Sequence, residues 1–407
     1  RVGFLSTHFR WHSVGRLTVG LLEELSRSGG VKVFVIHASI HARAARERSD
    51  RRDTPQRDDG AREKIAALKL DALVFGDVGM DALTTGLAHA RLSPVQVAFW
   101  GHPGTTGLST MDFFITSDLF EPKGNTKDGD AADILLGRYS KRSRSDDMEI
   151  IPERGDGCAG RRYAAAKAGS RQGAFSEQLV RLNGLGINFD DPVQMFRSKT
   201  RPTAKENSPR PRLYVCVQSL MKMHPAFDAA IAGILAEDPL AHVVLLRDSR
   251  QLLWHSRFRR RLRLAVDAAE ERKNITRQLW SRVRFVSSLS GRDFFDLQCR
   301  ADVVLDPFPF GGGVTTLEAL SCGTPVVSAG ALQSVHQGPE SESFSFALVE
   351  NLLASTKGDY VKKAVAVASP GPLRERVRRA LQFGSEHMMR GNGNVALDWE
   401  RFLRNAV

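Results

Sequence analysis

The chain has 407 residues, of which 42% are hydrophobic, and its formal net charge is +12. This length is enough for two domains of roughly 150 residues, each with its own core, so an enzyme-sized globular protein is expected. No run of about 18 apolar residues occurs and no signal peptide is visible, so neither a membrane span nor a membrane partner is expected. The positive charge suits anionic ligands or acidic partners, although a solubilising surface has the same composition.

The four cysteines are widely spaced, at Cys158, Cys216, Cys299 and Cys322. Two of them lie in apolar segments that are typical of buried thiols. This distribution predicts neither a disulfide framework nor a zinc site. A reducing compartment follows, and we expect a cytoplasmic or nucleocytoplasmic protein.

Residues 1–121 alternate between strand and helix patterns, beginning with an apolar strand at 2–7, a polar turn at 8–15 and an apolar-periodic helix at 16–25. Later strand patterns lie at 31–37, 70–77, 95–101 and 111–118. This alternation predicts a parallel α/β domain. The mixed charges of residues 41–64 predict a solvated helix or loop.

Residues 122–210 are predicted to form a charged insert and a connecting segment. Gly, Lys, Arg, Asp and Ser dominate residues 122–173, which show little periodicity. The insert contains DGD (128–130), which resembles the paired aspartates of divalent-metal sites. Because no apolar strand precedes these aspartates to fix their geometry, an acidic turn is favoured and no metal is expected.

The alternation of strands and helices returns in residues 211–370, which predict a second Rossmann-like half, and residues 371–407 predict a C-terminal helical segment. Strand patterns lie at 212–219, 242–249 and 282–288, and helix patterns at about 224–236, 257–273 and 292–301. The helix at 257–273 is rich in arginine.

The stretch LDPFPFGGGVTTLEALSCGTPVVS (305–328) places three glycines between a strand and a helix. A glycine-rich turn that opens a helix leaves unpaired backbone N–H groups at the positive end of the helix dipole, where a phosphate binds well. Thr315 and Thr316 are placed to cap this helix or to donate hydroxyls to the same anion, and Glu318 to accept from a ribose hydroxyl. A purely structural alternative, a tight turn followed by a threonine-capped helix, explains the same residues.

Two α/β domains in succession predict a cleft between them. Open α/β sheets bind ligands at the carboxyl ends of their strands. Residues 8–15 and 311–316 are therefore both expected to face that cleft.

Five segments match one known family in chain order. They are RVGFLSTHFRWHSVGRL (1–17), SPVQVAFWGHPGTTGLSTMDFFITSD (93–118), FSEQLVRLNGLGINF (175–189), VCVQSLMKMHP (215–225) and ADVVLDPFPFGGGVTTLEALSCGTPVVS (301–328). In these segments the chain resembles the catalytic region of the O-linked N-acetylglucosamine transferase and SPINDLY family, glycosyltransferase family 41. The resemblance implies the GT-B architecture, in which two Rossmann-like domains face an interdomain cleft that holds a nucleotide sugar, and it implies no metal or other cofactor.

The resemblance also assigns residues. Lys222 matches a catalytic lysine that contacts the diphosphate, where a positive charge stabilises the leaving group. Thr315 and Thr316 match residues that hold the diphosphate, and Glu318 matches one that binds the ribose. The full set of nucleotide-sugar residues expected beside Lys222 is Ser219, Phe294, Gly312, Gly313, Val314, Thr315, Thr316 and Glu318.

Some positions depart from the family pattern. Val314 stands where animal relatives have histidine, which leaves contact with the diphosphate to backbone N–H groups of the glycine turn. Phe294 replaces a histidine that stacks on the base, a task that an aromatic ring also performs. In GDVGMD (76–81), Met80 or Asp81 stands where a histidine is often found.

His12 matches a histidine discussed as a general base or as a donor-positioning group, and an imidazole suits proton transfer near neutral pH. A nearby position that is acidic in the family reads His8 here. Gly104, Thr105 and Thr106 are assigned to the acceptor or sugar site, with a simple turn as the alternative.

These assignments predict a metal-independent transferase that inverts at the anomeric carbon and moves a sugar onto Ser or Thr hydroxyls of a protein acceptor. UDP-N-acetylglucosamine is the preferred prediction for the donor. GDP-fucose is the alternative, because the fold alone does not distinguish which nucleotide sugar binds. A non-catalytic relative that binds a nucleotide or, through residues 257–273, an acidic partner is a further alternative. No specific nucleic acid is expected, since RNA-binding motifs are absent. Relatives carry tetratricopeptide repeats upstream that bind the acceptor, and no repeat of about 34 residues is visible here.

Overall fold

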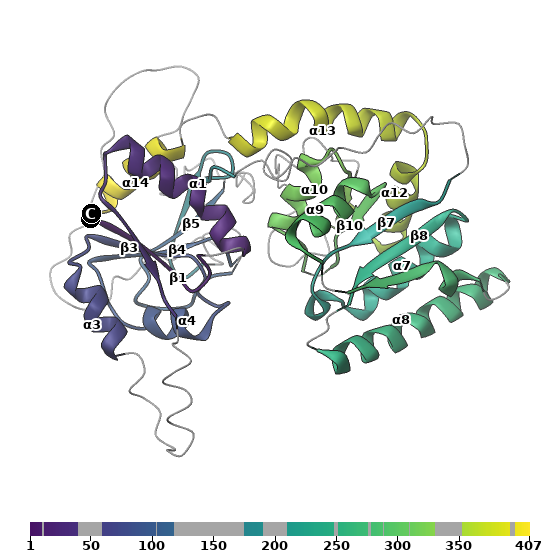
Figure 1. Cartoon of the computed structure of the whole chain (residues 1–407), viewed down its shortest axis with the longest axis horizontal. Coiled ribbons are helices and arrows are strands. Elements are labelled where there is room, and N and C mark those ends of the chain that lie inside the picture. The colour runs from purple at the N-terminus through teal and green to yellow at the C-terminus, as the bar shows by residue number, and fades with distance from the viewer. Residues whose placement is uncertain are drawn as a thin grey trace, which may run out of the picture. The chain divides into compact units, whose positions relative to one another are not determined.

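The computed structural model describes residues 1–9, 12–39, 59–102, 104–117, 175–189, 210–247, 251–275, 278–287, 289–308, 310–329, 352–390 and 395–407. The chain forms two compact units (Figure 1). The first contains Arg1–Phe189 and Gly391–Val407, and the second contains Asp190–Arg390. The whole insert at 122–173, with the DGD sequence and Cys158, lies outside the described residues, and so does most of the charged stretch 41–64.

The first unit is built on a six-stranded sheet with the order β2-β1-β3-β4-β5-β6, in which every described pairing is parallel. Its strands are β1 (Val2–Ser6), β2 (Val33–His37), β3 (Ala72–Phe75), β4 (Val95–Phe99), β5 (Phe113–Ser117) and β6 (Gln178–Leu182). Four of these strands are buried along their whole length, as expected for a parallel sheet covered on both faces. The predicted parallel α/β domain is confirmed.

The helices of the first unit are α1 (Ser13–Ser28), α3 (Asp59–Ala67), α4 (Ala82–Ala88) and α14 (Val395–Ala406). Helix α1 ends at Gly29, whose φ of 72° is the left-handed conformation that glycine adopts at helix C-termini. Helix α14 lies against α1 (Figure 1), and its Trp399 is fully buried with its ring 5.8 Å from that of Phe4. The Trp399 indole also donates to Gly186 O at 2.8 Å. Residues from both ends of the chain thus share one core.

The second unit is built on a five-stranded parallel sheet with the order β11-β10-β7-β8-β9. Its strands are β7 (Arg212–Cys216), β8 (Ala241–Leu246), β9 (Val283–Val286), β10 (Val303–Leu305) and β11 (Val326–Val327). Its helices are η2 (Leu220–Lys222), α7 (Pro225–Glu237), α8 (Leu252–Lys273), η3 (Leu279–Arg282), α9 (Gly291–Arg300), α10 (Val314–Ser321), α12 (Lys357–Ala368) and α13 (Pro372–Arg390). The second predicted Rossmann-like half is therefore present.

The boundaries of the units differ from the sequence-based ones at 121, 210 and 370. Strand β6 extends the first sheet beyond residue 121, because its residues 178–182 pair with β5. The predicted C-terminal segment 371–407 is divided between the units, since α13 belongs to the second and α14 to the first. Helix periodicity in α14 reveals a buried face but does not say which sheet buries it.

One cysteine prediction is wrong. Cys299, near the end of α9, forms a disulfide with Cys322, which follows α10, and the two Cα atoms are 5.0 Å apart. The partners are separated by 23 residues and meet because α9 packs against α10, a tertiary contact that spacing does not reveal. Cys216 is a buried free thiol at the end of β7, as its apolar segment predicts.

No helix among the described residues has the length and apolar character needed to cross a membrane.

Candidate functional site

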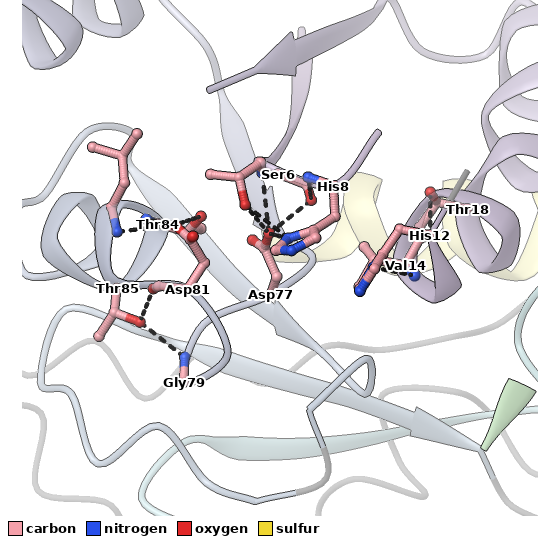
Figure 2. A network of polar contacts seen from close by, with 12 residues as sticks. Ser6, His8, His12, Val14, Thr18, Asp77, Gly79, Asp81, Thr84 and Thr85 are labelled. Carbon is pink, nitrogen blue, oxygen red and sulfur yellow. Dashed lines mark hydrogen bonds and ion pairs between the residues drawn. The ribbon is translucent and has the colours of Figure 1, made fainter. Parts of the chain in front are cut away.

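In the first unit, polar side chains gather where β1 and β3 end (Figure 2). The two strands are parallel neighbours, with Leu5 opposite Phe75, so the residues that follow them are brought to the same edge of the sheet. Asp77 comes two residues after β3, and Ser6, Thr7 and His8 lie at and just beyond the end of β1.

Asp77 is fully buried, and one of its oxygens, Oδ2, lies within hydrogen-bond distance of four groups. They are Ser6 Oγ at 2.8 Å, Thr7 N at 3.0 Å, Thr7 Oγ1 at 3.1 Å and His8 Nδ1 at 2.8 Å. The other oxygen, Oδ1, is buried and has no hydrogen-bond partner among the described residues. A buried carboxylate that gathers two backbone segments and a histidine in this way fixes the position of the imidazole.

His12, the predicted catalytic histidine, stands immediately before α1 and acts as its N-cap. Its Nδ1 accepts a hydrogen bond from Val14 N at 3.3 Å. The His12 ring lies 4.0 Å from the His8 ring, centroid to centroid, with 37° between their planes. His8 and Asp77 were not predicted as site residues, although His8 was recognised as a departure from the family pattern. The structure brings them together with His12.

Asp81 belongs to a separate cluster at the start of α4, as Figure 2 shows. Its Oδ1 accepts from Leu83 N at 2.9 Å and Thr84 N at 3.0 Å, so it caps the helix. Met80, beside it, is exposed. At the positions where relatives often have a histidine, this chain therefore has a helix cap and an exposed apolar residue.

The predicted loop of Gly104, Thr105 and Thr106 is tied to a buried glutamate. Glu177 accepts from Thr105 Oγ1 at 2.7 Å, from Thr106 N at 2.8 Å and from the Thr106 hydroxyl. Gly104 N donates to His102 Nδ1 at 3.4 Å. Both threonine hydroxyls are thus engaged within the protein, and a role for this loop in binding an acceptor stays a prediction.

In the second unit, the glycine turn lies between β10 and α10, as predicted. Asp306, the residue after β10, accepts from Gly312 N at 2.6 Å and from Ser328 Oγ at 2.9 Å, and so fixes the turn to the sheet. Gly312 is packed so closely that an added Cβ would lie 2.5 Å from Thr315 Oγ1 and even closer to Gln218 Nε2. At Gly313, the N-cap of α10, an added Cβ would meet nothing within 4 Å.

Lys222 reaches this turn from the neighbouring strand. It ends the short helix η2 after β7, which pairs directly with β10. Its Nζ donates to Gly311 O at 2.8 Å and to Gln218 Oε1 at 2.9 Å, and it lies 4.8 Å from the centre of the Phe310 ring. Burial lowers the pKa of Lys222, whereas the carboxylate of Asp306 acts in the opposite direction. The predicted juxtaposition of the lysine and the glycine turn is present.

The threonines after the turn lie in the first turn of α10. Thr315 Oγ1 accepts from the side chain of Gln218, whose other end accepts from Lys222, so a chain of contacts links the lysine, the amide and the helix. Neither threonine is the N-cap, because that position is Gly313. The alternative in which a threonine caps this helix is therefore wrong, since the helix begins one residue before Thr315.

The other predicted nucleotide-sugar residues differ in accessibility. Glu318 is only 2% exposed and accepts from Gln298 Nε2 at 3.1 Å, and Val314 is also buried. Phe294, in the first turn of α9, is half-buried, and Ser219, which precedes η2, is exposed. The side chains that sequence reasoning missed here, Gln218 and Asp306, each follow a buried strand, and that position is the only signal they carry.

No family model matches the chain. The tomato protein (Solanum lycopersicum) described as probable UDP-N-acetylglucosamine–peptide N-acetylglucosaminyltransferase SPINDLY is 25% identical over 303 residues, which are 73% of this chain and 26% of that protein. The protein of the same description from Petunia hybrida is 25% identical over 308 residues, with the same coverage of 73% and 26%. The chain resembles the SPINDLY and O-GlcNAc transferase family.

A solved structure agrees in fold. That of a mutant O-GlcNAc transferase from Thermobaculum terrenum matches with a TM-score of 0.66 at 21% identity, over 100% of this chain and 68% of that chain. The two parallel-sheet α/β units are thus of the GT-B type, as predicted. The chain spans about a quarter of the length of the SPINDLY proteins that it matches.

Proposed function

We propose that the chain is the catalytic region of an inverting glycosyltransferase that takes a sugar from a nucleoside diphosphate. The observation that carries this proposal is Lys222 held against the glycine turn, with Nζ 2.8 Å from Gly311 O. A lysine beside the N-terminal end of α10 places a positive charge and backbone N–H groups at one point. These are the groups that stabilise a departing diphosphate, and we therefore propose that no metal is required.

The acceptor and the first donor come from the relatives. Both SPINDLY proteins carry names that specify UDP-N-acetylglucosamine as donor and a peptide as acceptor. We extend this chemistry to the chain, with Ser or Thr hydroxyls of proteins as acceptors. Glu318, which already accepts a hydrogen bond from Gln298, is assigned to the ribose, and Phe294 to the nucleobase. GDP-fucose is retained as the alternative donor. The predicted compartment and the upstream tetratricopeptide repeats stay predictions.

Titration calorimetry with UDP and with GDP, in the presence of chelator, tests this function. Tight UDP binding that Lys222→Ala and Thr316→Val each weaken by about tenfold, near 1.4 kcal/mol, is expected. Lys273→Ala is the matched control, because Lys273 pairs with Glu237 at the end of α8, away from the glycine turn. Tighter binding of GDP than of UDP would favour GDP-fucose as the donor. If the chain binds neither UDP nor GDP, the proposed glycosyltransferase function is refuted.

A second candidate function rests on α8. Its exposed residues include Arg257, Arg259 and Arg260, and the apolar side chains of Leu253 and Trp254 lie one turn before them. Such a helix binds an acidic partner mainly through charge. Binding to an acidic peptide that disappears at moderate salt and is unaffected by UDP would favour this function over sugar transfer.

A further inference from the structure

The contacts of Asp77 determine which nitrogen of His8 carries a proton. Ser6 Oγ, Thr7 N and Thr7 Oγ1 all donate to Asp77 Oδ2, so this oxygen is an acceptor. His8 Nδ1 lies 2.8 Å from the same oxygen and must therefore donate to it. Thr7 Oγ1, whose only proton points to Asp77, accepts from the same Nδ1–H at 2.7 Å. A neutral His8 then has its lone pair on Nε2.

His12 is held in the opposite tautomer. Its Nδ1 accepts the N–H of Val14 at 3.3 Å, so Nδ1 carries the lone pair. In a neutral His12 the proton is therefore on Nε2, and this nitrogen is a hydrogen-bond donor. For His12 to accept a proton at Nε2, it would first have to lose its own proton or leave its place as the cap of α1. The two adjacent rings are thus prepared for different tasks.

The position of His8 suits a group that receives a proton. Its side chain is 17% exposed, so the ring is reachable from solvent although its Nδ1 is turned inward to a fully buried carboxylate. Within the described part of the chain, no hydrogen bond involves His8 Nε2. A buried carboxylate behind an imidazole holds the required tautomer and stabilises the imidazolium that forms on proton uptake.

We propose that His8, rather than His12, is the general base of the reaction, and that Asp77 is its positioning residue. This inference rests on the proposed function. The acceptor hydroxyl oxygen forms a bond to the anomeric carbon, the bond from that carbon to the diphosphate breaks, and its electron pair leaves with the diphosphate. The hydroxyl proton passes to His8 Nε2. His12 donates a hydrogen bond from Nε2 to an oxygen of the acceptor or the sugar.

Four variants test the assignment in a transfer assay with UDP-N-acetylglucosamine, or GDP-fucose if GDP is the tighter ligand, and a Ser/Thr acceptor peptide. His8→Ala is expected to lower kcat by about 10²- to 10⁴-fold, with the UDP Kd and the peptide KM within about threefold. Added imidazole is expected to restore part of that activity. Asp77→Asn, which presents an amide to Nδ1, is expected to lower kcat on the order of 10²-fold or more. His12→Ala is expected to lower kcat less than His8→Ala.

The fourth variant, Asp81→Asn, is the matched control, because it makes the same change in a capping residue of α4. Its kcat is expected to stay within about threefold of the wild type. A His8→Ala protein that keeps its kcat would overturn the inference, as would a loss that imidazole does not rescue or a larger loss in His12→Ala. All of these outcomes require a wild type that binds nucleotide. If the wild type binds neither UDP nor GDP, the proposed function fails and the assignment of His8 fails with it.

Discussion

Replacement of Gly312 by alanine tests whether the packing of the glycine turn sets nucleotide affinity. The added Cβ would lie 2.5 Å from Thr315 Oγ1, 2.9 Å from Thr316 Oγ1 and closer still to Gln218 Nε2. Non-bonded heavy atoms ordinarily approach to about 3.5–4.0 Å, so these groups must move by roughly 1 Å. Overpacking of this kind costs about 1–3 kcal/mol. Because Gln218 also contacts Lys222, the displacement reaches the lysine.

The melting temperature is expected to fall by about 2–4 °C for each kcal/mol of unfolding free energy that is lost. The Kd for UDP is expected to rise about fivefold or more. Calorimetric titration measures the affinity and differential scanning calorimetry the stability. Gly358→Ala, in the first turn of α12, is the control, since a Cβ there meets only Thr356 Oγ1 at 3.9 Å, an ordinary contact distance, and the change is expected to alter the free energy of unfolding by less than about 1 kcal/mol. Equal UDP affinities in the two variants would refute the idea that the packing around Gly312 positions the site.

Two predictions concern stability. Burial alone would raise the pKa of Asp238, but hydrogen bonds from Arg212, Tyr214 and Leu240 N outweigh it and hold that pKa below its usual value. The stabilisation is therefore present above the unfolded-state pKa and is lost as the pH falls through the folded-state pKa. Between about pH 5 and pH 2, the free energy of unfolding measured with urea should therefore fall more in the wild type than in Asp238→Asn. A parallel decline in both proteins would contradict this. In α14, Trp399→Ala should cost about 3–5 kcal/mol because the side chain is fully buried, whereas Leu397→Ala, at a residue 56% exposed, should change the free energy of unfolding by less than about 0.5 kcal/mol. Similar losses in the two helix variants would show that α14 does not complete the first core.

Much of the fold follows from local patterns. Apolar runs that end in Gly, Ser or Asp mark β1, β3, β7 and β10, and helical periodicity marks α1 and α7, because burial on a parallel sheet imposes both patterns on the sequence. The glycine turn was recognisable for the same reason, since close packing leaves no room for a side chain at Gly312. Lys222 follows the strand next to that turn, and only the family resemblance, which assigned both to the diphosphate, had linked the two.

Features that depend on tertiary contact were not recognisable. Asp77 is one of many aspartates near a turn, and nothing local indicates that its carboxylate meets His8, because the two are separated by 69 residues. The same holds for the disulfide between Cys299 and Cys322 and for the packing of α14 in the first unit. Both depend on tertiary contacts, which the spacing of residues in the sequence does not reveal. The tautomers of His8 and His12 likewise depend on partners that only the folded chain supplies.

The place of α14 has a consequence for biosynthesis. The first unit is interrupted by the whole of the second, about 200 residues, before residues 395–407 supply Trp399. At roughly 5–20 residues per second, a ribosome needs about 10–40 s to make that intervening segment. During this interval Phe4 and Phe99, whose rings pack against that of Trp399, lack this partner, so apolar surface of the kind that promotes aggregation is expected to stay exposed on the first unit. The second unit is one continuous segment, Asp190–Arg390, so all of its residues have been synthesised before α14 is made.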